Sequence, residues 1–322
     1  MRVEGSLRIG RILSVRSVAV LALAGASVLG SSGASSASSS FPAPGTAPQI
    51  ASLVAKSHLI KSLPANLDPS LGSLGQDSFS HYYPSTGPYG CVTTTQCVFA
   101  DTHSSKSVVL YGDSHAAMWL SALIPAVTAA HERLVLLWYP FCPTANVKVW
   151  NPLTRSPNVQ CGTYRTKFAG MIHALDPRLV LLADRTSGNR NYSNKEISDA
   201  AWKAGEIETI KNLRSSTTRV AVIGDISVFS SNVANCMAAN QSNVQRCSVG
   251  NPSPKKDQHF AAERAAATSQ NVPYINAEQW LCTSTCSSVV GNFAVFFDQF
   301  HVSATYAAFL SGVFASALKK LL

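Results

Sequence analysis

Short, nearly continuous apolar runs alternate with amphipathic stretches from about residue 106 to the end of the chain. Such runs are typical of parallel β-strands that are covered on both faces of a sheet. They predict strands at residues 108–111, 134–138, 179–183 and 220–223, and a shorter one at 273–276.

The stretches between these runs have helical periodicity. One apolar face comprises Ala116, Leu120, Leu123, Ile124 and Val127, and further helices are expected over residues 162–174, 196–213 and 257–270. The last helix begins near Ser303, a favourable N-cap, and one of its sides carries Ala307, Leu310, Phe314, Ala317 and Leu321. Strands that alternate with helices are joined by right-handed crossovers. The pattern therefore predicts a three-layer α/β/α sandwich with a central parallel sheet of about five strands, of flavodoxin-like type.

The sequence before residue 106 has a different character. Residues 31–48 are mainly Ser, Ala, Gly and Pro, and we expect residues 38–48 to form a flexible linker. Residues 49–105 are predicted to be an N-terminal extension, with a short helix over 49–62 and a turn-rich run over 63–69. The α/β/α domain is then expected to span residues 106–322.

The N-terminus has the pattern of a secretory signal. Arg2, Arg8, Arg11 and Arg16 precede an apolar stretch over residues 18–29, and small residues follow at 35–37. A helix needs about 20 apolar residues to span a bilayer, so this stretch is short for a permanent anchor. We predict a signal peptide over residues 1–37 and a secreted or cell-envelope protein, with an uncleaved anchor as the alternative.

The composition fits a globular chain with a large core. Hydrophobic residues make up 46% of the chain and charged residues 13%, about half of the roughly 25% that is usual, which argues against disorder and coiled coils. The net charge is +9, but the only adjacent lysine pairs are Lys255–Lys256 and Lys319–Lys320, without interleaved aromatic residues. A nucleic-acid partner therefore has little support, whereas a mild attraction to acidic envelope polymers is compatible with the charge.

The cysteines form an even set, as expected of an exported protein. They fall into four neighbouring couples, which predict the disulfides Cys91–Cys97, Cys142–Cys161, Cys236–Cys247 and Cys282–Cys286. A zinc site is the alternative, but no couple has the C-x2-C spacing and no histidine is near in sequence. We therefore expect no metal.

The candidate nucleophile follows the first predicted strand of the domain. There the chain reads Gly112-Asp113-Ser114-His115, with a helix starting at or just after the serine. Reactive groups gather beyond the carboxyl ends of parallel strands, and a helix N-terminus stabilises a developing oxyanion. Gly112 would permit a tight turn, and His115 is a candidate for lining the pocket. The alternative is that Ser114 is only an N-cap.

A candidate base lies just before the last helix. Asp298 precedes His301 by three residues, so it can hold Nδ1 of the imidazole and leave Nε2 to accept a serine proton. The topology brings this segment to the same sheet edge as Ser114. The alternative is that Asp298 merely caps the helix.

Other polar residues follow later strands. Arg185, next to Asp184, is a candidate for contacting a substrate or an oxyanion, although a surface ion pair would explain both residues. Gly224-Asp225 repeats the first block without its serine and is interpreted as a structural turn, and His259 as part of a solvated helix start. No phosphate loop, dinucleotide fingerprint or carboxylate metal cluster is present, so no cofactor is expected.

These motifs resemble the SGNH hydrolase superfamily. The block over residues 109–116 with Trp119, the Cys142-Pro143 pair and Leu281-Cys282 resemble more narrowly the extracytoplasmic SGNH domain of bacterial acyltransferase-3 membrane proteins, over roughly residues 50–322. The resemblance implies Ser114 as nucleophile, His301 as general base and Asp298 as its orienting residue. It also implies ester chemistry that moves acetyl or similar short acyl groups onto or off sugar hydroxyls.

The resemblance is incomplete in three respects. The superfamily's second-block glycine has no counterpart after Trp138, and no G-x-N-D follows the third strand. These blocks normally complete the oxyanion hole, so within it only the Ser114 backbone N–H is assigned, with Gly112, Asp113, His115 and Arg185 as oxyanion or substrate-binding candidates. The ten-helix membrane part that supplies acyl groups in that family has no counterpart in these 322 residues.

Two functions of different classes remain open. The first is an exported serine esterase or O-acyltransferase that forms an acyl-Ser114 intermediate and acts on envelope polysaccharides or other acylated glycans. For transfer, a separate membrane acyltransferase would be the acyl donor. The second is a non-catalytic glycan-binding module with the same fold, which the missing oxyanion blocks favour and the complete Ser, Asp and His set disfavours. A third interpretation is a structural domain held together by disulfides. In that case the presence of Ser114, Asp298 and His301 in these positions would be a coincidence.

Overall fold

The computed structural model describes residues 41–87, 90–250 and 259–322. The predicted signal peptide lies outside the described residues. Residues from Phe41 to Leu322 belong to one compact unit. Within the described ranges, no helix has both the length and the apolar character that crossing a membrane requires.

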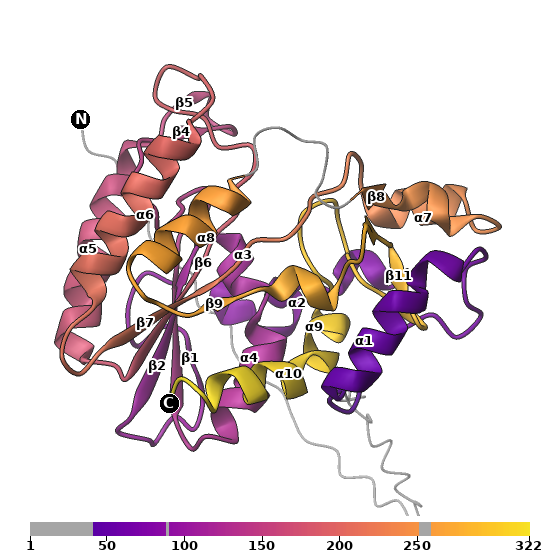
Figure 1. The fold of residues 1–322 in the computed structure, drawn as a ribbon, viewed down its shortest axis with the longest axis horizontal. Helices are drawn as coiled ribbons and strands as arrows, with labels where there is room; N and C mark the ends of the chain where they lie inside the picture. Colours follow the sequence, from indigo (N-terminus) through magenta and orange to yellow (C-terminus); the bar gives the residue numbers. More distant parts are fainter. Residues whose placement is uncertain (1–40, 88–89, 251–258) are drawn as a thin grey trace, which may run out of the picture. The chain divides into compact units, whose positions relative to one another are not determined.

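A six-stranded sheet, in the order β1-β3-β2-β6-β7-β9, forms the centre of this unit (Figure 1). Its strands are β1 (Val98–Ala100), β2 (Ser107–Gly112), β3 (Arg133–Trp138), β6 (Leu179–Ala183), β7 (Arg219–Ile223) and β9 (Tyr274–Ile275). All neighbours are parallel except β1, which pairs antiparallel with β3 at the edge. The five predicted strands are confirmed to within one residue at each end. The sixth, β1, comes from the segment predicted to be an extension.

Helices cover both faces of the sheet, which confirms the three-layer prediction (Figure 1). The α-helices of the described residues are α1 (Ala47–Lys56), α2 (Phe79–Tyr82), α3 (Ser114–Ala117), α4 (Leu120–Thr128), α5 (Val159–Leu175), α6 (Asp199–Leu213), α7 (Val233–Ala239), α8 (Phe260–Ser269), α9 (Ala304–Phe309) and α10 (Ser311–Leu318). Successive side chains of β2 point to opposite faces of the sheet and enter two different hydrophobic clusters. Val108 and Leu110 pack with α4, α9 and α10, whereas Val109 and Tyr111 pack with α5 and α6.

The predicted closing helix is interrupted after Phe309. Ser303 caps α9 as expected, because its side chain accepts a hydrogen bond from Tyr306 N–H. The break has a long-range cause, since the Phe309 carbonyl accepts a hydrogen bond from Gly45 N–H at 2.7 Å. A Cβ on Gly312 would lie 2.6 Å from the Gly45 oxygen. The N-terminal segment therefore docks where the helix is interrupted.

This contact corrects the prediction of a flexible linker over residues 38–48. The described part of that range already belongs to the compact unit, and α1 begins at Ala47 with Thr46 as its N-cap. The predicted helix over 49–62 ends as α1 at Lys56, followed by a 3-10 turn over Ser57–Leu59. The boundary at residue 105 does not separate two bodies, because β1 belongs to the main sheet.

Four disulfides join the cysteines in the predicted couples, and none of the cysteines is free. Cys91–Cys97 closes the loop that directly precedes β1. Cys142–Cys161 connects the loop after β3 to α5. Small two-stranded ribbons complete the fold: β4 (Trp150–Asn151) with β5 (Ser156–Pro157), β8 (Val249–Gly250) with β10 (Thr285–Cys286), and β11 (Val289–Val290) with β12 (Phe293–Ala294).

Candidate active site

The register of the sheet places several candidate residues at one edge. Gly112 at the end of β2 is aligned with Trp138 of β3 and with Ala183 of β6. Ser114 starts α3 directly beyond this point, and Asp184 and Arg185 follow β6 at the same level. Because the strands are parallel, the polar residues after them are brought together at the carboxyl edge.

Gly112 is required by packing between strands rather than by an unusual backbone angle. A Cβ at this position would lie 1.8 Å from the backbone oxygen of Ala183 and 2.9 Å from the Cβ of Ala116. The glycine therefore lets β6 approach the turn that leads to Ser114. Its predicted role in oxyanion or substrate binding stays a prediction beside this structural one.

Ser114, His301 and Asp298 form a hydrogen-bonded chain. Nε2 of His301 lies 2.9 Å from the Ser114 hydroxyl oxygen, and Nδ1 lies 2.7 Å from Oδ2 of Asp298. The other carboxylate oxygen of Asp298 accepts hydrogen bonds from the backbone N–H groups of Phe300 and His301, each at 2.7 Å. With Asp298 accepting from Nδ1, Nε2 is left to accept the serine proton.

The environment keeps Asp298 ionised. Burial by itself would raise the pKa of Asp298, but His301 and the hydrogen bonds from His301 and Phe300 outweigh it, and the pKa lies below its usual range. The His301 side chain is 16% exposed and the Asp298 side chain 26%. A negative orienting group and a solvent-accessible imidazole are what a serine nucleophile needs.

Asp113 is buried and stabilises the backbone around the site. Only 3% of the residue is exposed, and its carboxylate accepts hydrogen bonds from the backbone N–H groups of His115 and Arg185. Burial raises the pKa of Asp113, although His115 and these hydrogen bonds oppose the change. The predicted substrate-binding role is therefore corrected: Asp113 is the N-cap of α3 and ties it to the loop after β6.

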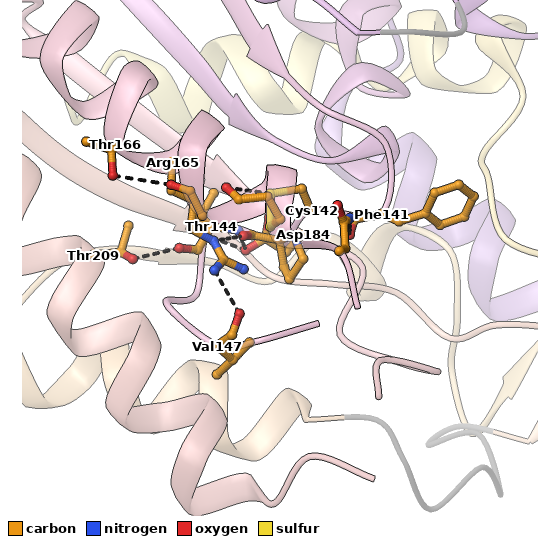
Figure 2. The surroundings of a disulfide bond; sticks show 12 residues. Phe141, Cys142, Thr144, Val147, Arg165, Thr166, Asp184 and Thr209 are labelled. Carbon is orange, nitrogen blue, oxygen red and sulfur yellow. Dashed lines mark hydrogen bonds between the residues drawn. A yellow bond between two sulfur atoms is a disulfide. The ribbon is translucent and has the colours of Figure 1, made fainter. Parts of the chain in front are cut away.

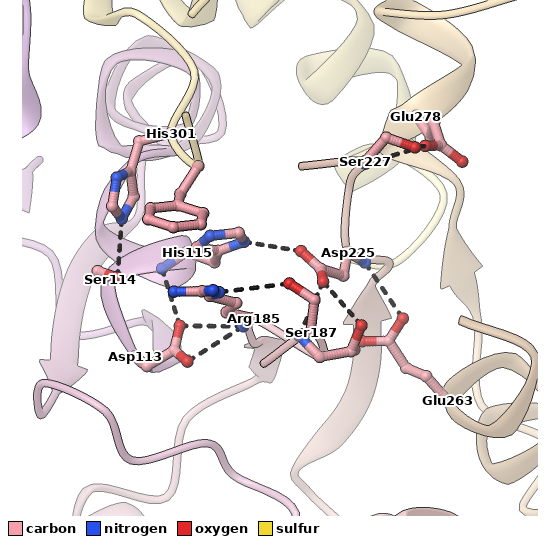
Figure 3. A network of polar contacts seen from close by, with 12 residues as sticks. Asp113, Ser114, His115, Arg185, Ser187, Asp225, Ser227, Glu263, Glu278 and His301 are labelled. Carbon is pink, nitrogen blue, oxygen red and sulfur yellow. Dashed lines mark hydrogen bonds and ion pairs between the residues drawn. The ribbon is translucent and has the colours of Figure 1, made fainter. Parts of the chain in front are cut away.

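His115 is equally buried and does not line an open pocket. Its side chain is 1% exposed, and Nδ1 lies 2.7 Å from Oδ1 of Asp225 (Figure 3). The Gly224-Asp225 block, interpreted from sequence as a structural turn, thus supplies the partner of His115. In the sequence, Asp225 is indicated by the Gly-Asp pattern that follows two of the parallel strands, at Gly112-Asp113 and at Gly224-Asp225.

Arg185 lies at the rim of the site. Its guanidinium stacks over the Phe300 ring at 3.8 Å from the centroid, and its Nε donates to the Ser187 hydroxyl at 3.3 Å. Phe297 stacks on the His301 ring with centroids 5.5 Å apart. Phe297 directly precedes Asp298 and Phe300 directly precedes His301, but single apolar residues in a loop carry no distinctive pattern, so the sequence did not indicate them.

Asp184 is buried, with 2% of the residue exposed, so the alternative of a surface ion pair does not explain it. Its Oδ2 accepts hydrogen bonds from the backbone and hydroxyl of Thr144, at 2.8 and 2.5 Å (Figure 2). Thr144 lies in the loop held by Cys142–Cys161, and its carbonyl accepts from the Thr209 hydroxyl. Burial, together with Asp113 and Glu206, raises the pKa of Asp184 well above its ordinary value. Asp184 therefore fixes the disulfide-bonded loop.

The loops after β3 and β6 show how the site departs from the superfamily pattern. Phe141, after β3, has a φ of 54°, a left-handed conformation that usually favours glycine. Asn189, after β6, donates its amide to the carbonyls of Arg185 and Thr186 within its own loop. The Asn189 side-chain amide thus donates within its own loop and stabilises that loop.

Residues 81–316 match the sequence family described as the SGNH domain fused to AT3 domains. This match covers well over half of the chain, so the protein belongs to that family. Comparison with curated protein sequences gives no match.

Solved structures of the same fold come from several bacteria. The periplasmic domain of a lipopolysaccharide acetyltransferase from Salmonella ser. Paratyphi A is 17% identical, with a TM-score of 0.54 over 75% of this chain and 97% of that domain. A carbohydrate acetylesterase from Sinorhizobium meliloti is 14% identical, with a TM-score of 0.44 over 67% of this chain and all of the other. At 17% identity, the likeness to the Salmonella domain shows a shared fold alone.

Proposed function

We propose that this protein is an exported serine esterase or O-acyltransferase that acts on short acyl esters of cell-envelope glycans. The observation that carries the proposal is the continuous chain from the Ser114 hydroxyl through His301 to Asp298. Membership of the SGNH family supports ester chemistry. The four disulfides support a location outside the cytoplasm, where such bonds persist.

In the first step, the Ser114 oxygen attacks the ester carbonyl while Nε2 of His301 takes the hydroxyl proton. Asp298 stabilises the imidazolium that forms. When the tetrahedral intermediate collapses, the bond to the leaving oxygen breaks and that oxygen takes the proton from His301. The result is an acyl-Ser114 enzyme and a free alcohol.

In the second step, an oxygen nucleophile attacks the acyl-enzyme and transfers its proton to His301. Water as the nucleophile gives hydrolysis, whereas a sugar hydroxyl gives transfer and a new ester. His301 then returns the proton to Ser114 as the acyl–serine bond breaks, so the enzyme is regenerated. Exclusion of water decides between the two outcomes.

The developing negative charge on the carbonyl oxygen needs donors. We assign the backbone N–H of Ser114, at the start of α3, as one of them. Arg185 is a cationic candidate at the rim, where its guanidinium stacks on Phe300 and donates to Ser187. We propose that it contacts the substrate or the oxyanion.

The glycan substrate class is supported by the relatives rather than by a bound ligand. The Salmonella neighbour is described as the periplasmic domain of a lipopolysaccharide acetyltransferase, and the family to which this chain belongs is described as fused to AT3 domains. By analogy, a separate membrane acyltransferase is the proposed acyl donor for a transfer reaction, and an envelope polysaccharide is the proposed acceptor.

The experiment traps the acyl-enzyme. The purified protein is mixed with p-nitrophenyl acetate, quenched in acid and mapped by peptide mass spectrometry. We expect acetate on Ser114 in the wild type, none in Ser114→Ala, and unchanged acetylation in the surface control Ser316→Ala. Adding oligosaccharide acceptors and measuring acetylated sugar separates transfer from hydrolysis. A folded wild type that neither turns over nor acetylates Ser114 would favour the glycan-binding module instead.

A further inference from the structure

A second histidine–aspartate pair lies next to the proposed triad. His115 Nδ1 is 2.7 Å from Oδ1 of Asp225, and the other oxygen of Asp225 accepts from the backbone N–H and the hydroxyl of Thr186 at 2.7 and 2.8 Å. Both oxygens of Asp225 are thus engaged, one by the His115 ring and the other by Thr186. The His115 ring is therefore held in one orientation in the protein interior.

This ring contacts the imidazole of His301. Their centroids are 5.2 Å apart and the planes are inclined by 65°, an edge-to-face arrangement. Figure 3 shows His115 between the Ser114–His301 pair and Asp225. His115 also follows Ser114 directly in α3, so a single short element carries both the nucleophile and a neighbour of the base.

His301 needs a contact from outside its own loop. Asp298 and His301 lie in one tight loop between the bridged residues Phe296 and Val302, and Phe297, which stacks on His301, belongs to the same loop. These local contacts fix the imidazole relative to the loop. They do not fix it relative to Ser114, which belongs to another part of the sheet edge. Phe79 of α2 is one such contact, with its ring centroid 6.3 Å from that of His301, but it does not belong to the element that carries Ser114. His115, which lies in α3 beside Ser114 and is hydrogen-bonded to Asp225 after β7, connects His301 to that element.

We propose that His115, anchored by Asp225, is a positioning residue that holds the His301 imidazole in line with the Ser114 hydroxyl. This inference rests on the proposed function, in which His301 is the base for Ser114. Misplacing a reacting group by about 1 Å can cost 10²-fold in rate. Loss of the His115 ring is therefore expected to lower kcat by about 10- to 100-fold, with little change in KM.

The chain provides a matched control for this test. His259 is also buried, at 2% exposure, and its Nδ1 lies 2.6 Å from Oδ1 of Asp199. It stacks on Trp202 of α6 instead of on a triad residue. His115→Gln removes a ring and keeps an N–H donor for the aspartate. His259→Gln makes the same side-chain change at a ring that stacks on Trp202, and it keeps the backbone N–H that His259 donates to Thr186.

The test combines kinetics on p-nitrophenyl acetate with NMR of protein labelled with ¹⁵N-histidine. The Nδ1–H signal of His301 is assigned by its loss in His301→Ala. We expect His115→Gln to lower kcat and to shift or broaden this signal, and His259→Gln to leave both at wild-type values even where the two variants lose similar thermal stability. If His115→Gln does not fold, Asp225→Asn is the second variant. It keeps the His115 ring but weakens the hydrogen bond that holds it, so we again expect a lower kcat and a shifted or broadened His301 signal.

Equal effects of the two histidine variants on kcat and on the His301 signal would overturn the positioning role, and so would an unchanged signal in His115→Gln. The NMR result does not depend on turnover. A wild type without esterase activity whose His301 signal still responds to His115→Gln would therefore refute the proposed function and leave the positioning contact intact.

Discussion

At the scale of single residues, the proposed base His301 and its proposed orienting acid Asp298 come from one turn of the chain. Asp298 contacts His301 through both its side chain and the backbone N–H groups of that turn, so the pair is assembled locally. This arrangement explains why the sequence alone could pair the two residues. Their approach to Ser114, 187 residues away, required the sheet topology as well.

Asp298→Asn tests the tautomer that this turn imposes. An asparagine amide facing Nδ1 would favour the proton on Nε2, where it blocks acceptance of the Ser114 proton. We expect kcat to fall by up to about 10⁴-fold, as in a serine protease with the same change, with little effect on KM. Steady-state kinetics check the result. Activity close to wild type would show that Asp298 does not set the tautomer.

Buried acids behind the site make stability depend on pH. Burial raises the pKa of Glu206 from its ordinary value of 4.5 to about 7, although Arg165 opposes the change. Between these values the folded protein keeps a proton that the unfolded chain releases. The free energy of unfolding therefore falls as the pH rises from about 4.5 to 7.

Glu206→Gln imitates the protonated side chain and is expected to flatten part of this decline. Urea unfolding at pH 4.5, 6 and 7.5 measures it. The other buried acids whose pKa values are raised, such as Asp184 and Glu263, stay in the variant and contribute the same sign. An unchanged pH dependence would mean that Glu206 is ionised in the folded protein over the whole range.

The sequence did not show which of the polar residues near the site are buried. The block Gly112 to His115 identified the site, yet Asp113 and His115 turn inward because capping and the Asp225 pair satisfy them. His259 was expected at a solvated helix start but is buried against Trp202, which corrects that expectation. Each of these positions depends on a partner far away in the chain.

At the scale of elements, strands were predicted well because buried parallel strands are apolar throughout. β1 was missed since it is short and its residues are only half-buried, so no apolar run marks it. The interruption between α9 and α10 was missed for a different reason. Its helical periodicity is intact, and the break depends on Gly45 from the other end of the chain.

The contact between β2 and β6 beneath the nucleophile can be tested with Gly112→Ala. Its Cβ would meet the Ala183 oxygen at 1.8 Å, so the two strands must separate at the level of Ser114. We expect a loss of about 1–3 kcal/mol of stability together with a large loss of esterase activity. Chemical denaturation and kinetics check both effects.

Gly170→Ala is the matched control. This glycine lies within α5, where a Cβ would meet nothing within 4 Å. Alanine is the better helix former there, so we expect a gain of about 0.5–1 kcal/mol and unchanged activity. Equal stability of the two alanine variants would argue against the strand contact.

At the scale of the whole molecule, the N-terminal segment is part of the α/β/α unit. Asp77 accepts hydrogen bonds from the backbone and hydroxyl of Thr305 in α9, just after His301. Phe79 lies against the rings of Trp138 and His301. The segment that the sequence suggested as an extension thus supports the loop that carries the base.

Truncation tests this integration. A chain that begins at residue 41 is expected to fold, whereas one that begins at residue 106 loses β1, α1 and the Asp77 contacts and should show no cooperative thermal transition. Circular dichroism during heating measures the difference. A cooperative transition in the shorter chain would restore the predicted domain boundary.

The central claim is that Ser114 is an activated nucleophile, and a fluorophosphonate tests it most directly. Only an activated serine reacts rapidly with such a reagent. The account predicts one phosphonate per molecule by intact mass, located on Ser114 by peptide mapping, and no rapid labelling of Ser114→Ala or His301→Ala. A folded, oxidised wild type that remains unlabelled, or labelling that persists in Ser114→Ala, would contradict it.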